Sequence, residues 1–175
     1  MTTASARLWR SATMPAVVVP DAIGSELAAD ARARLERAGY SRYGRIDRAS
    51  YDHVDDPPLP ELVEALLGIA EAVTGRAGKV SAVRAIRLEP GDYLLTRHDR
   101  VLDDRPLELV LDLSASPVDR AEVHFRHRGQ VFFTMTSQPG ALAIVERGPT
   151  VMSNHTYVSK RLRGSVVRLV VHLAA

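Results

Sequence analysis

The sequence predicts an α+β fold: a single domain in which helices precede a run of antiparallel strands that form a closed or nearly closed double-sheet barrel. Two amphipathic helical patterns lie in the first half, and from Lys79 onward β-branched segments alternate with Gly, Pro and Asp. Because the links between these later segments are short and contain no helical pattern, parallel βαβ units are excluded. We expect one domain over residues 1–175, with an N-terminal arm and helical support over 1–78 and a β core over 79–175.

Each predicted helix has an apolar face and ends at a glycine. The first begins at Pro20-Asp21, with Asp21 as its N-cap, and ends at Gly39, whereas Pro57-Pro58 and Pro60 introduce the second, which ends at Gly75. The apolar positions that define the two faces are Ile23, Leu27, Ala31 and Leu35 in the first helix, and Leu62, Leu66, Ile69 and Val73 in the second. We expect both helices to cover one outer face of the barrel.

The other segments are predicted to be irregular or β. Residues 1–14 should form a loose arm or a first edge strand, and the polar stretch 40–56 a loop or a lid over a site. The clearest hairpin turns at Arg128-Gly129, between two runs rich in Val and Phe. The predicted strands are 80–88, 92–98, 106–113, 121–127, 131–136, 141–145, 150–158 and 165–173.

Composition indicates an ordinary globular protein of the cytoplasm. The 23 basic and 21 acidic residues leave a net charge of +2, so nucleic acid is not an expected partner. No segment has the apolar length of a membrane span or the apolar core of a signal peptide, so a membrane is not expected either. Because the chain has no cysteine, any metal must be held by His and carboxylate side chains.

Two histidines are the main candidates for a metal site. His98 is followed by Asp99 near the end of a predicted strand, and His155 lies on a later strand. Two histidines and one carboxylate can bind one face of an octahedral iron and leave positions open for oxygen and a cosubstrate. Arg163, with Ser165 two residues on, could present a guanidinium to a carboxylate in bidentate fashion. The alternative interpretations are an exposed turn, a hydrogen-bonded barrel histidine and surface charge.

From about residue 80 to 173 the sequence resembles the prolyl-hydroxylase-like branch of the iron(II)- and 2-oxoglutarate-dependent dioxygenases. The matching motifs, in order, are Gly91-Asp92-Tyr93, Arg105 before the strand Leu107 to Leu113, Pro139-Gly140, His155 and Arg163-Gly164-Ser165. The resemblance implies an antiparallel double-stranded β-helix, a jelly-roll or cupin-like barrel. It also implies Fe(II) and 2-oxoglutarate as cofactors, His155 as the distal iron ligand, and 2-oxoglutarate contacts from Arg163, Ser165 and Tyr93.

The first ligand motif departs from the family pattern. Counted along the motif, the family's His falls at Arg97, which cannot bind iron, and its Asp at Asp99. If His98 is the ligand, the carboxylate comes from Asp99, Asp103 or Asp104. Adjacent strand residues point to opposite faces, so His98 and Asp99 can share a metal only at a bulge or a strand end. Otherwise Arg97 stands where the metal was, in a member that has lost iron.

The sequence therefore predicts an iron(II)/2-oxoglutarate-dependent oxygenase, with His98, Asp99 and His155 as metal ligands. Its substrate would be a C–H bond of a small molecule or a peptidyl side chain. One alternative is a metal-free barrel of the same descent that binds a carboxylated small molecule. A structural or partner-binding domain is the third interpretation, and it predicts neither iron nor anion binding.

Overall fold

The computed structural model describes residues 2–95, 106–148 and 150–174 of the chain. Its helices are α1 (Thr2–Ser11), α2 (Ser25–Ala38) and α3 (Pro60–Thr74). The first strands are β1 (Ala16–Val19), β2 (Ser41–Arg45), β3 (Ala49–Asp55), β4 (Lys79–Leu88) and β5 (Tyr93–Leu94). The later strands are β6 (Leu107–Asp112), β7 (Val123–His127), β8 (Gln130–Met135), β9 (Leu142–Glu146), β10 (Val151–His155) and β11 (Val166–Ala174).

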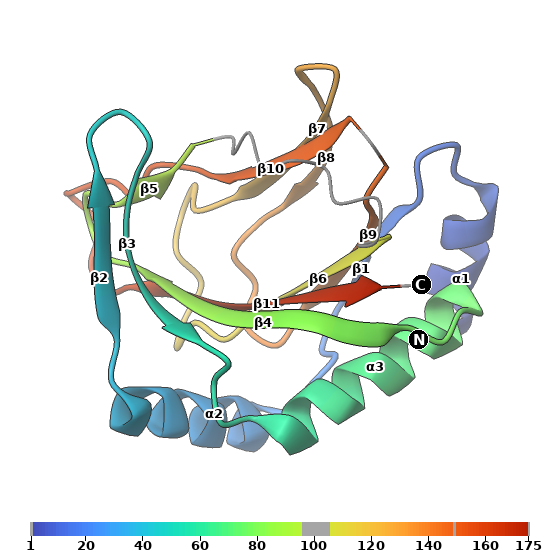
Figure 1. Cartoon of the computed structure of the whole chain (residues 1–175), viewed down its shortest axis with the longest axis horizontal. Helices are drawn as coiled ribbons and strands as arrows, with labels where there is room; N and C mark the ends of the chain where they lie inside the picture. Colours follow the sequence, from blue (N-terminus) through green and yellow to red (C-terminus); the bar gives the residue numbers. More distant parts are fainter. Residues whose placement is uncertain (1, 96–105, 149, 175) are drawn as a thin grey trace.

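The strands form a nearly closed antiparallel barrel of two layers (Figure 1). The strand order is β1-β9-β6-β11-β4-β3-β5-β10-β7-β8, with β2 on the far side of β3. The larger layer runs from β1 to β3, and the smaller one contains β5, β10, β7 and β8. β3 joins the layers, because Ala49 and Ser50 pair with β5 whereas Asp52 and the residues after it pair with β4. The predicted double-stranded β-helix is confirmed.

The larger sheet separates two apolar cores. Along β11, Val167, Leu169 and Val171 pack in the core that contains the helices, whereas Val166 and Val170 pack in the barrel interior. This alternation follows from the period of two along a strand. Both faces of β11 are therefore buried, which explains why its sequence is an almost unbroken apolar run.

The two predicted helices are confirmed as α2 and α3, beneath the larger sheet in Figure 1. Gly39 and Gly75 follow them with φ of 81° and 71°, which a glycine adopts without strain. The predicted N-cap is wrong: α2 starts after Gly24, and Asp21 lies in a preceding turn with φ 47°. No helix of the described residues has the length and apolar character needed to cross a membrane.

Two segments expected to be irregular are regular. Residues 2–11 form α1 instead of a loose arm, because Trp9, only 4% exposed, packs into the helix-side core. Within the stretch 40–56, β2 and β3 form a hairpin instead of a loop, and Tyr51 of β3 is buried in the barrel. Hydrogen bonding of β3 to both β4 and β5 explains why so polar a segment is a strand.

The remaining strand predictions are confirmed within the described residues, most with shifts of one or two residues at their ends. The turn at Arg128-Gly129 joins β7 to β8, with both residues at positive φ, as a two-residue hairpin requires. The second predicted strand is described only as Tyr93–Leu94, because residues 96–105 lie outside the described residues.

Gly140 is a position where the fold requires glycine. Its φ is 82°, and an added Cβ would lie 2.9 Å from the carbonyl oxygen of Ile23. We expect Gly140→Ala to lower the free energy of unfolding by about 1–3 kcal/mol, from backbone strain and this clash. Gly44→Ala is the control, because nothing lies within 4 Å of its added Cβ. Equal urea midpoints for the two variants would contradict the assignment.

Candidate functional site

A buried guanidinium crosses the barrel interior. Arg168 on β11 is 1% exposed, and His155 at the end of β10 is 3% exposed. Nη1 of Arg168 donates a hydrogen bond to Nδ1 of His155 at 2.9 Å, and Nη2 donates to the carbonyl oxygen of Ala121 at 2.7 Å. Arg168 thus links the larger sheet to the smaller one from inside the barrel.

The register of β11 explains why Arg168 points inward. It lies between Val166 and Val170, both in the barrel core, and is paired across the ladder with Asp112 of β6 and Ile86 of β4. Because the side-chain period of a strand is two, all three inward positions of β11 share one face. The site is therefore built on central strands, whose backbone is held on both sides.

Asp112 does not neutralise Arg168 by direct contact. Its carboxylate is fully buried and accepts hydrogen bonds from the backbone N–H of Ser114 at 2.8 Å, the N–H of Gln138 at 2.7 Å and the hydroxyl of Ser137 at 3.0 Å. Among the described residues, no carboxylate forms an ion pair with Arg168. Asp112 instead fixes the loops that close this end of the barrel.

The charge of Arg168 is poorly compensated. Burial lowers the pKa of Arg168 to about 10, against the opposing effects of Asp112 and Glu122. Within the described part of the chain, its buried Nε–H has no hydrogen-bond partner. A buried cation is costly unless it is paired and its hydrogen bonds are satisfied. This environment therefore favours an anionic ligand, and a carboxylate matches the planar guanidinium best.

His155 is the one predicted metal ligand that lies among the described residues. It is a buried imidazole, and it pairs with Leu94 of β5, the strand that leads towards the predicted ligands His98 and Asp99. Those two lie outside the described residues. Within the described ranges, no group of three or more His, Asp or Glu side chains could hold a metal ion. The described residues thus supply one candidate ligand for iron and one partner for a carboxylate.

None of the three predicted 2-oxoglutarate contacts is fully buried. Arg163 is exposed in the segment between β10 and β11, and Ser165 is half-buried just before β11. Tyr93 is half-buried on β5, opposite Ser50 of β3. Their proposed roles stay predictions.

Arg168, the residue that does contact His155, is not among the site residues predicted from the sequence. The signal that could have identified it is a lone charge in the apolar run of β11, because a strand buried on both faces has no solvent for a charged side chain.

A second polar bridge crosses the interior further along β6. Glu108 is 2% exposed, and it accepts a hydrogen bond from Nη1 of Arg147, which also donates to Ser153 of β10 at 3.3 Å. Because Glu108 and Arg147 neutralise one another, this bridge does not require an anion. Arg168 differs from it in this respect.

Asp92 ties together three segments around β5. Both of its carboxylate oxygens accept hydrogen bonds from Arg42 of β2, and it also accepts from the hydroxyl of Ser50 at 2.8 Å and the N–H of Glu89 at 3.0 Å. Its carbonyl oxygen accepts from the N–H of Val158 at 2.9 Å. Asp92 therefore fixes the hairpin β2–β3, the turn before β5 and the segment after His155 relative to one another.

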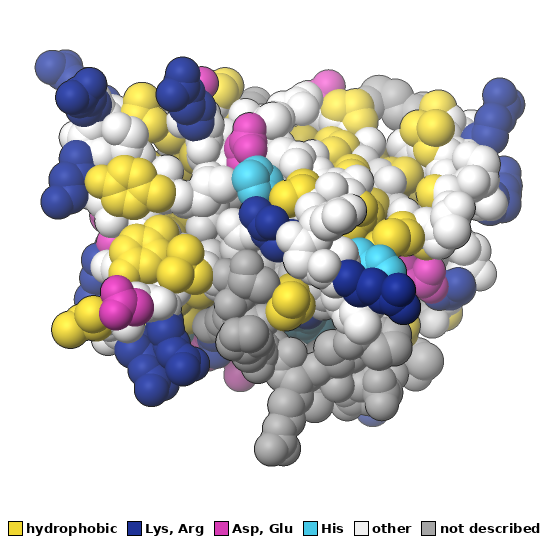
Figure 2. All heavy atoms as spheres, turned by 90° about the horizontal axis from the view of Figure 1, so that it is seen from above, with side chains coloured by type: hydrophobic (Ala, Val, Ile, Leu, Met, Phe, Trp, Pro, Cys, Tyr) yellow, Lys and Arg dark blue, Asp and Glu magenta, His cyan; other side chains and the backbone are white. Residues whose placement is uncertain are grey.

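The outer face of the smaller sheet mixes apolar, basic, acidic and histidine side chains, with no kind dominant (Figure 2). His124 of β7 lies with its Nε2 2.6 Å from a carboxylate oxygen of Glu122. Because Val123 and Phe125 on either side point into the barrel, His124 points outward, away from Arg168. It is a useful reference histidine outside the candidate site.

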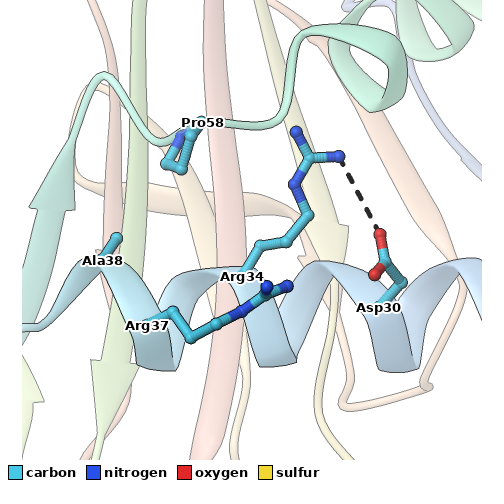
Figure 3. A pocket seen from close by; sticks show the side chains of 5 residues that line it. All are labelled: Asp30, Arg34, Arg37, Ala38 and Pro58. Carbon is cyan, nitrogen blue, oxygen red and sulfur yellow. Dashed lines mark ion pairs between the residues drawn. The ribbon is translucent and has the colours of Figure 1, made fainter.

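A surface hollow of about 480 Å³ lies beside α2, on the helix side of the larger sheet (Figure 3). It is lined by Asp30, Arg34, Arg37, Ala38 and Pro58. Arg34 is paired with Asp30 at 3.8 Å and with Glu61 at 3.0 Å. None of the predicted site residues lines this hollow.

Comparisons with known proteins give structural matches only. No protein-family model matches the chain, and no curated protein matches it. An oxidoreductase of the 2OG-Fe(II) oxygenase family from Burkholderia pseudomallei matches with TM-score 0.77 and 12% identity over 99% of this chain and 91% of its own. A Pseudomonas putida prolyl-4-hydroxylase matches with TM-score 0.75 and 16% identity over 97% and 98%.

A third match is the epimerase SnoN in complex with Fe3+, alpha ketoglutarate and nogalamycin RO. It has TM-score 0.71 and 14% identity, over 99% of this chain and 83% of its own. At these identities the likeness establishes the fold and leaves the chemistry to be argued from the residues of this chain.

Proposed function

The chain has the double-stranded β-helix fold of the 2-oxoglutarate- and iron(II)-dependent oxygenases, and from this premise we propose that it is an oxygenase of that kind. Its substrate would be a C–H bond of a small molecule or a peptidyl side chain. The observation that carries the proposal is Arg168, a buried guanidinium with an unpartnered Nε–H among the described residues, beside a buried histidine.

In this proposal Arg168 binds one carboxylate of 2-oxoglutarate, the role predicted from the sequence for Arg163. Arg168 suits it because it is inside the barrel and reaches His155, whereas Arg163 is exposed. A bidentate pair would satisfy the free Nε–H and neutralise the buried charge. Ser165 and Tyr93 stay predicted contacts.

His155 would hold iron together with the predicted ligands His98 and Asp99. Iron, when bound, supplies oxygen activation and the oxidising power of the reaction. The protein supplies orientation and a dry pocket, for which Val110, Val170 and Phe125 provide apolar interior walls. Arg168 lies on β11 of the larger sheet and His155 at the end of β10 of the smaller sheet, so the cosubstrate and the metal would be held by rigid elements.

A second candidate, a metal-free barrel that binds a carboxylated small molecule, is favoured by one observation. Arg168 donates to Nδ1 of His155, so the two candidate residues are bonded to each other and not arranged as separate ligands. A carboxylate could bind Arg168 in this arrangement without any metal.

Anaerobic reconstitution with iron separates the two candidates. For the oxygenase we expect the wild type to bind iron, to show the visible charge-transfer band when 2-oxoglutarate is added, and to convert 2-oxoglutarate to succinate. His155→Ala should lose at least about 90% of the iron, because one of three ligands is removed. His124→Ala is the control, since His124 lies outside the barrel.

Other results of the reconstitution would favour the metal-free candidate or contradict both candidates. Binding of 2-oxoglutarate without iron uptake would support the metal-free candidate. Binding of neither would contradict both. Full iron uptake by His155→Ala would remove His155 from the ligand set.

A further inference from the structure

One end of the molecule carries exposed apolar side chains among unpaired basic ones. We propose that this surface docks an acidic segment of a partner protein, outside the barrel interior. The surface, called the basic end below, consists of the tip of the hairpin β2–β3 (residues 45–48), Leu95 after β5, and residues 157–163 between β10 and β11. The proposal does not depend on iron, on 2-oxoglutarate or on the oxygenase reaction.

Backbone contacts hold the three segments of the basic end side by side. The N–H of Leu95 donates to the carbonyl oxygen of Arg48 at 3.0 Å, and the N–H of Val158 donates to the carbonyl oxygen of Asp92 at 2.9 Å. Between these contacts, β5 pairs with β3 on one side and with β10 on the other. The basic end is therefore one continuous surface, built around β5 at the left of Figure 1.

The basic side chains of this surface are exposed and have no acidic partner. They are Arg45, Arg48, Lys160, Arg161 and Arg163. Within the described part of the chain none of the five forms an ion pair, whereas Arg42 of the same hairpin is paired with Asp52 at 3.1 Å. Five positive charges thus stand against one negative charge, that of Asp47. Such an excess attracts an anionic partner and speeds its association.

Three apolar side chains lie among these charges. Ile46 at the hairpin tip is 88% exposed, Tyr157 is 50% exposed and Leu95 is 48% exposed. The left end of Figure 2 shows apolar side chains surrounded by Lys and Arg. Apolar contacts within a charged rim are the usual anatomy of a protein–protein interface. An acidic segment with apolar side chains between its carboxylates matches both features.

Two other anionic partners match the basic end less well. A single-stranded nucleic acid stacks its bases on aromatic side chains, but two of the three exposed apolar side chains, Ile46 and Leu95, are aliphatic. A membrane surface is commonly bound by an amphipathic helix, and the three segments of the basic end contain no helix. These features favour a protein partner.

A short fluorescent peptide rich in glutamate, with leucine at every third position, is a suitable probe. Its binding to the wild-type protein would be measured by fluorescence anisotropy at low salt. We expect the peptide to bind about tenfold or more tightly than a matched peptide with glutamine in place of glutamate, and raised salt to weaken it. No binding of the acidic peptide at low salt would overturn the proposal.

Reversal of charge at the hairpin tip should remove this affinity. Arg45→Glu combined with Arg48→Glu should weaken binding of the peptide by about tenfold or more. Arg7→Glu combined with Arg10→Glu is the matched control, because both arginines are exposed on α1 and neither forms an ion pair among the described residues. It should keep the affinity within about twofold of the wild type. Equal weakening by the two double variants would overturn the proposal.

An uncharged variant tests the apolar part of the surface. Ile46→Ser should weaken binding by about threefold or more and leave the urea midpoint unchanged, because the side chain is 88% exposed. An affinity equal to that of the wild type would overturn the apolar contact.

Further measurements keep the test decisive. If the variant at the hairpin tip does not fold, Lys160→Glu combined with Arg161→Glu takes its place. Tighter binding to phosphatidylserine vesicles or to single-stranded DNA than to the acidic peptide would overturn the protein partner. All measurements use the metal-free full chain, so their outcome and that of the iron reconstitution are independent.

Discussion

Arg168→Met should weaken the binding of 2-oxoglutarate, with a dissociation constant raised about 100-fold or more. The reason is that Arg168 is the buried cation of the barrel interior whose charge has no ion-pair partner among the described residues. Methionine has a similar length and apolar character, so it leaves the interior packed. Because an unpaired buried charge is removed, folding stability should stay the same or rise.

Isothermal titration of metal-free protein with 2-oxoglutarate would measure this loss. Arg163→Met provides the comparison, with an affinity expected to lie within about twofold of the wild type, as for a rim charge. The opposite pattern, in which Arg163→Met loses binding and Arg168→Met keeps it, would restore Arg163 as the carboxylate partner. A urea titration of both variants would show whether either result reflects unfolding.

Asp92→Asn should lower the free energy of unfolding by about 2 kcal/mol at neutral pH, because it removes the charge that Arg42 contacts through both carboxylate oxygens. Burial opposes the ionisation of Asp92, but hydrogen bonds from Arg42, Ser50 and the N–H of Glu89 outweigh it, and its pKa is lowered. The ionised form is therefore favoured by folding.

The sign of the pH dependence follows. A carboxyl group whose pKa is lowered in the folded state stabilises the fold at pH values above its unfolded-state pKa, which is about 3.9 for Asp. That contribution is lost as the pH falls through the folded-state pKa. Wild-type stability should therefore decline below about pH 4, and Asp92→Asn should decline less steeply.

Asp55→Asn is the control, because Asp55 is half exposed and its pair with Arg84 is a surface pair, expected to contribute less than about 1 kcal/mol. Urea unfolding at several pH values would test this. Parallel curves for wild type and Asp92→Asn would contradict the assignment.

Local chemistry explains which parts of the fold the sequence could predict. Gly39 and Gly75 end helices, and Arg128-Gly129 makes a hairpin, because positive φ is a property of a few residues and can be recognised locally. The helix α1 and the strand β3 depend on partners far along the chain. Trp9 meets the helix-side core and Tyr51 the barrel core, and neither contact is visible in the local pattern.

In the candidate site, too, some features can be predicted from the local sequence and others depend on contacts far along the chain. The strand pattern predicts that His155 lies in the barrel, and it is buried there. The Arg-X-Ser motif predicts Arg163, but a motif does not state which side chain points into the barrel. β11 begins at Val166, so Arg163 precedes it and Arg168 lies within it. Its role there could be argued only from burial and register.

The alternation along β11 has a consequence for how this protein can change. Val167 and Leu169 pack against the helix side of the sheet, whereas Val166, Arg168 and Val170 face the barrel interior. Residues that hold the fold together thus alternate along β11 with residues of the candidate site, and the two sets face opposite sides of the sheet. Mutation of the inner positions can explore new ligands while the helix-backed side keeps the architecture constant, so a library confined to those inner positions should give many folded proteins with diverse binding.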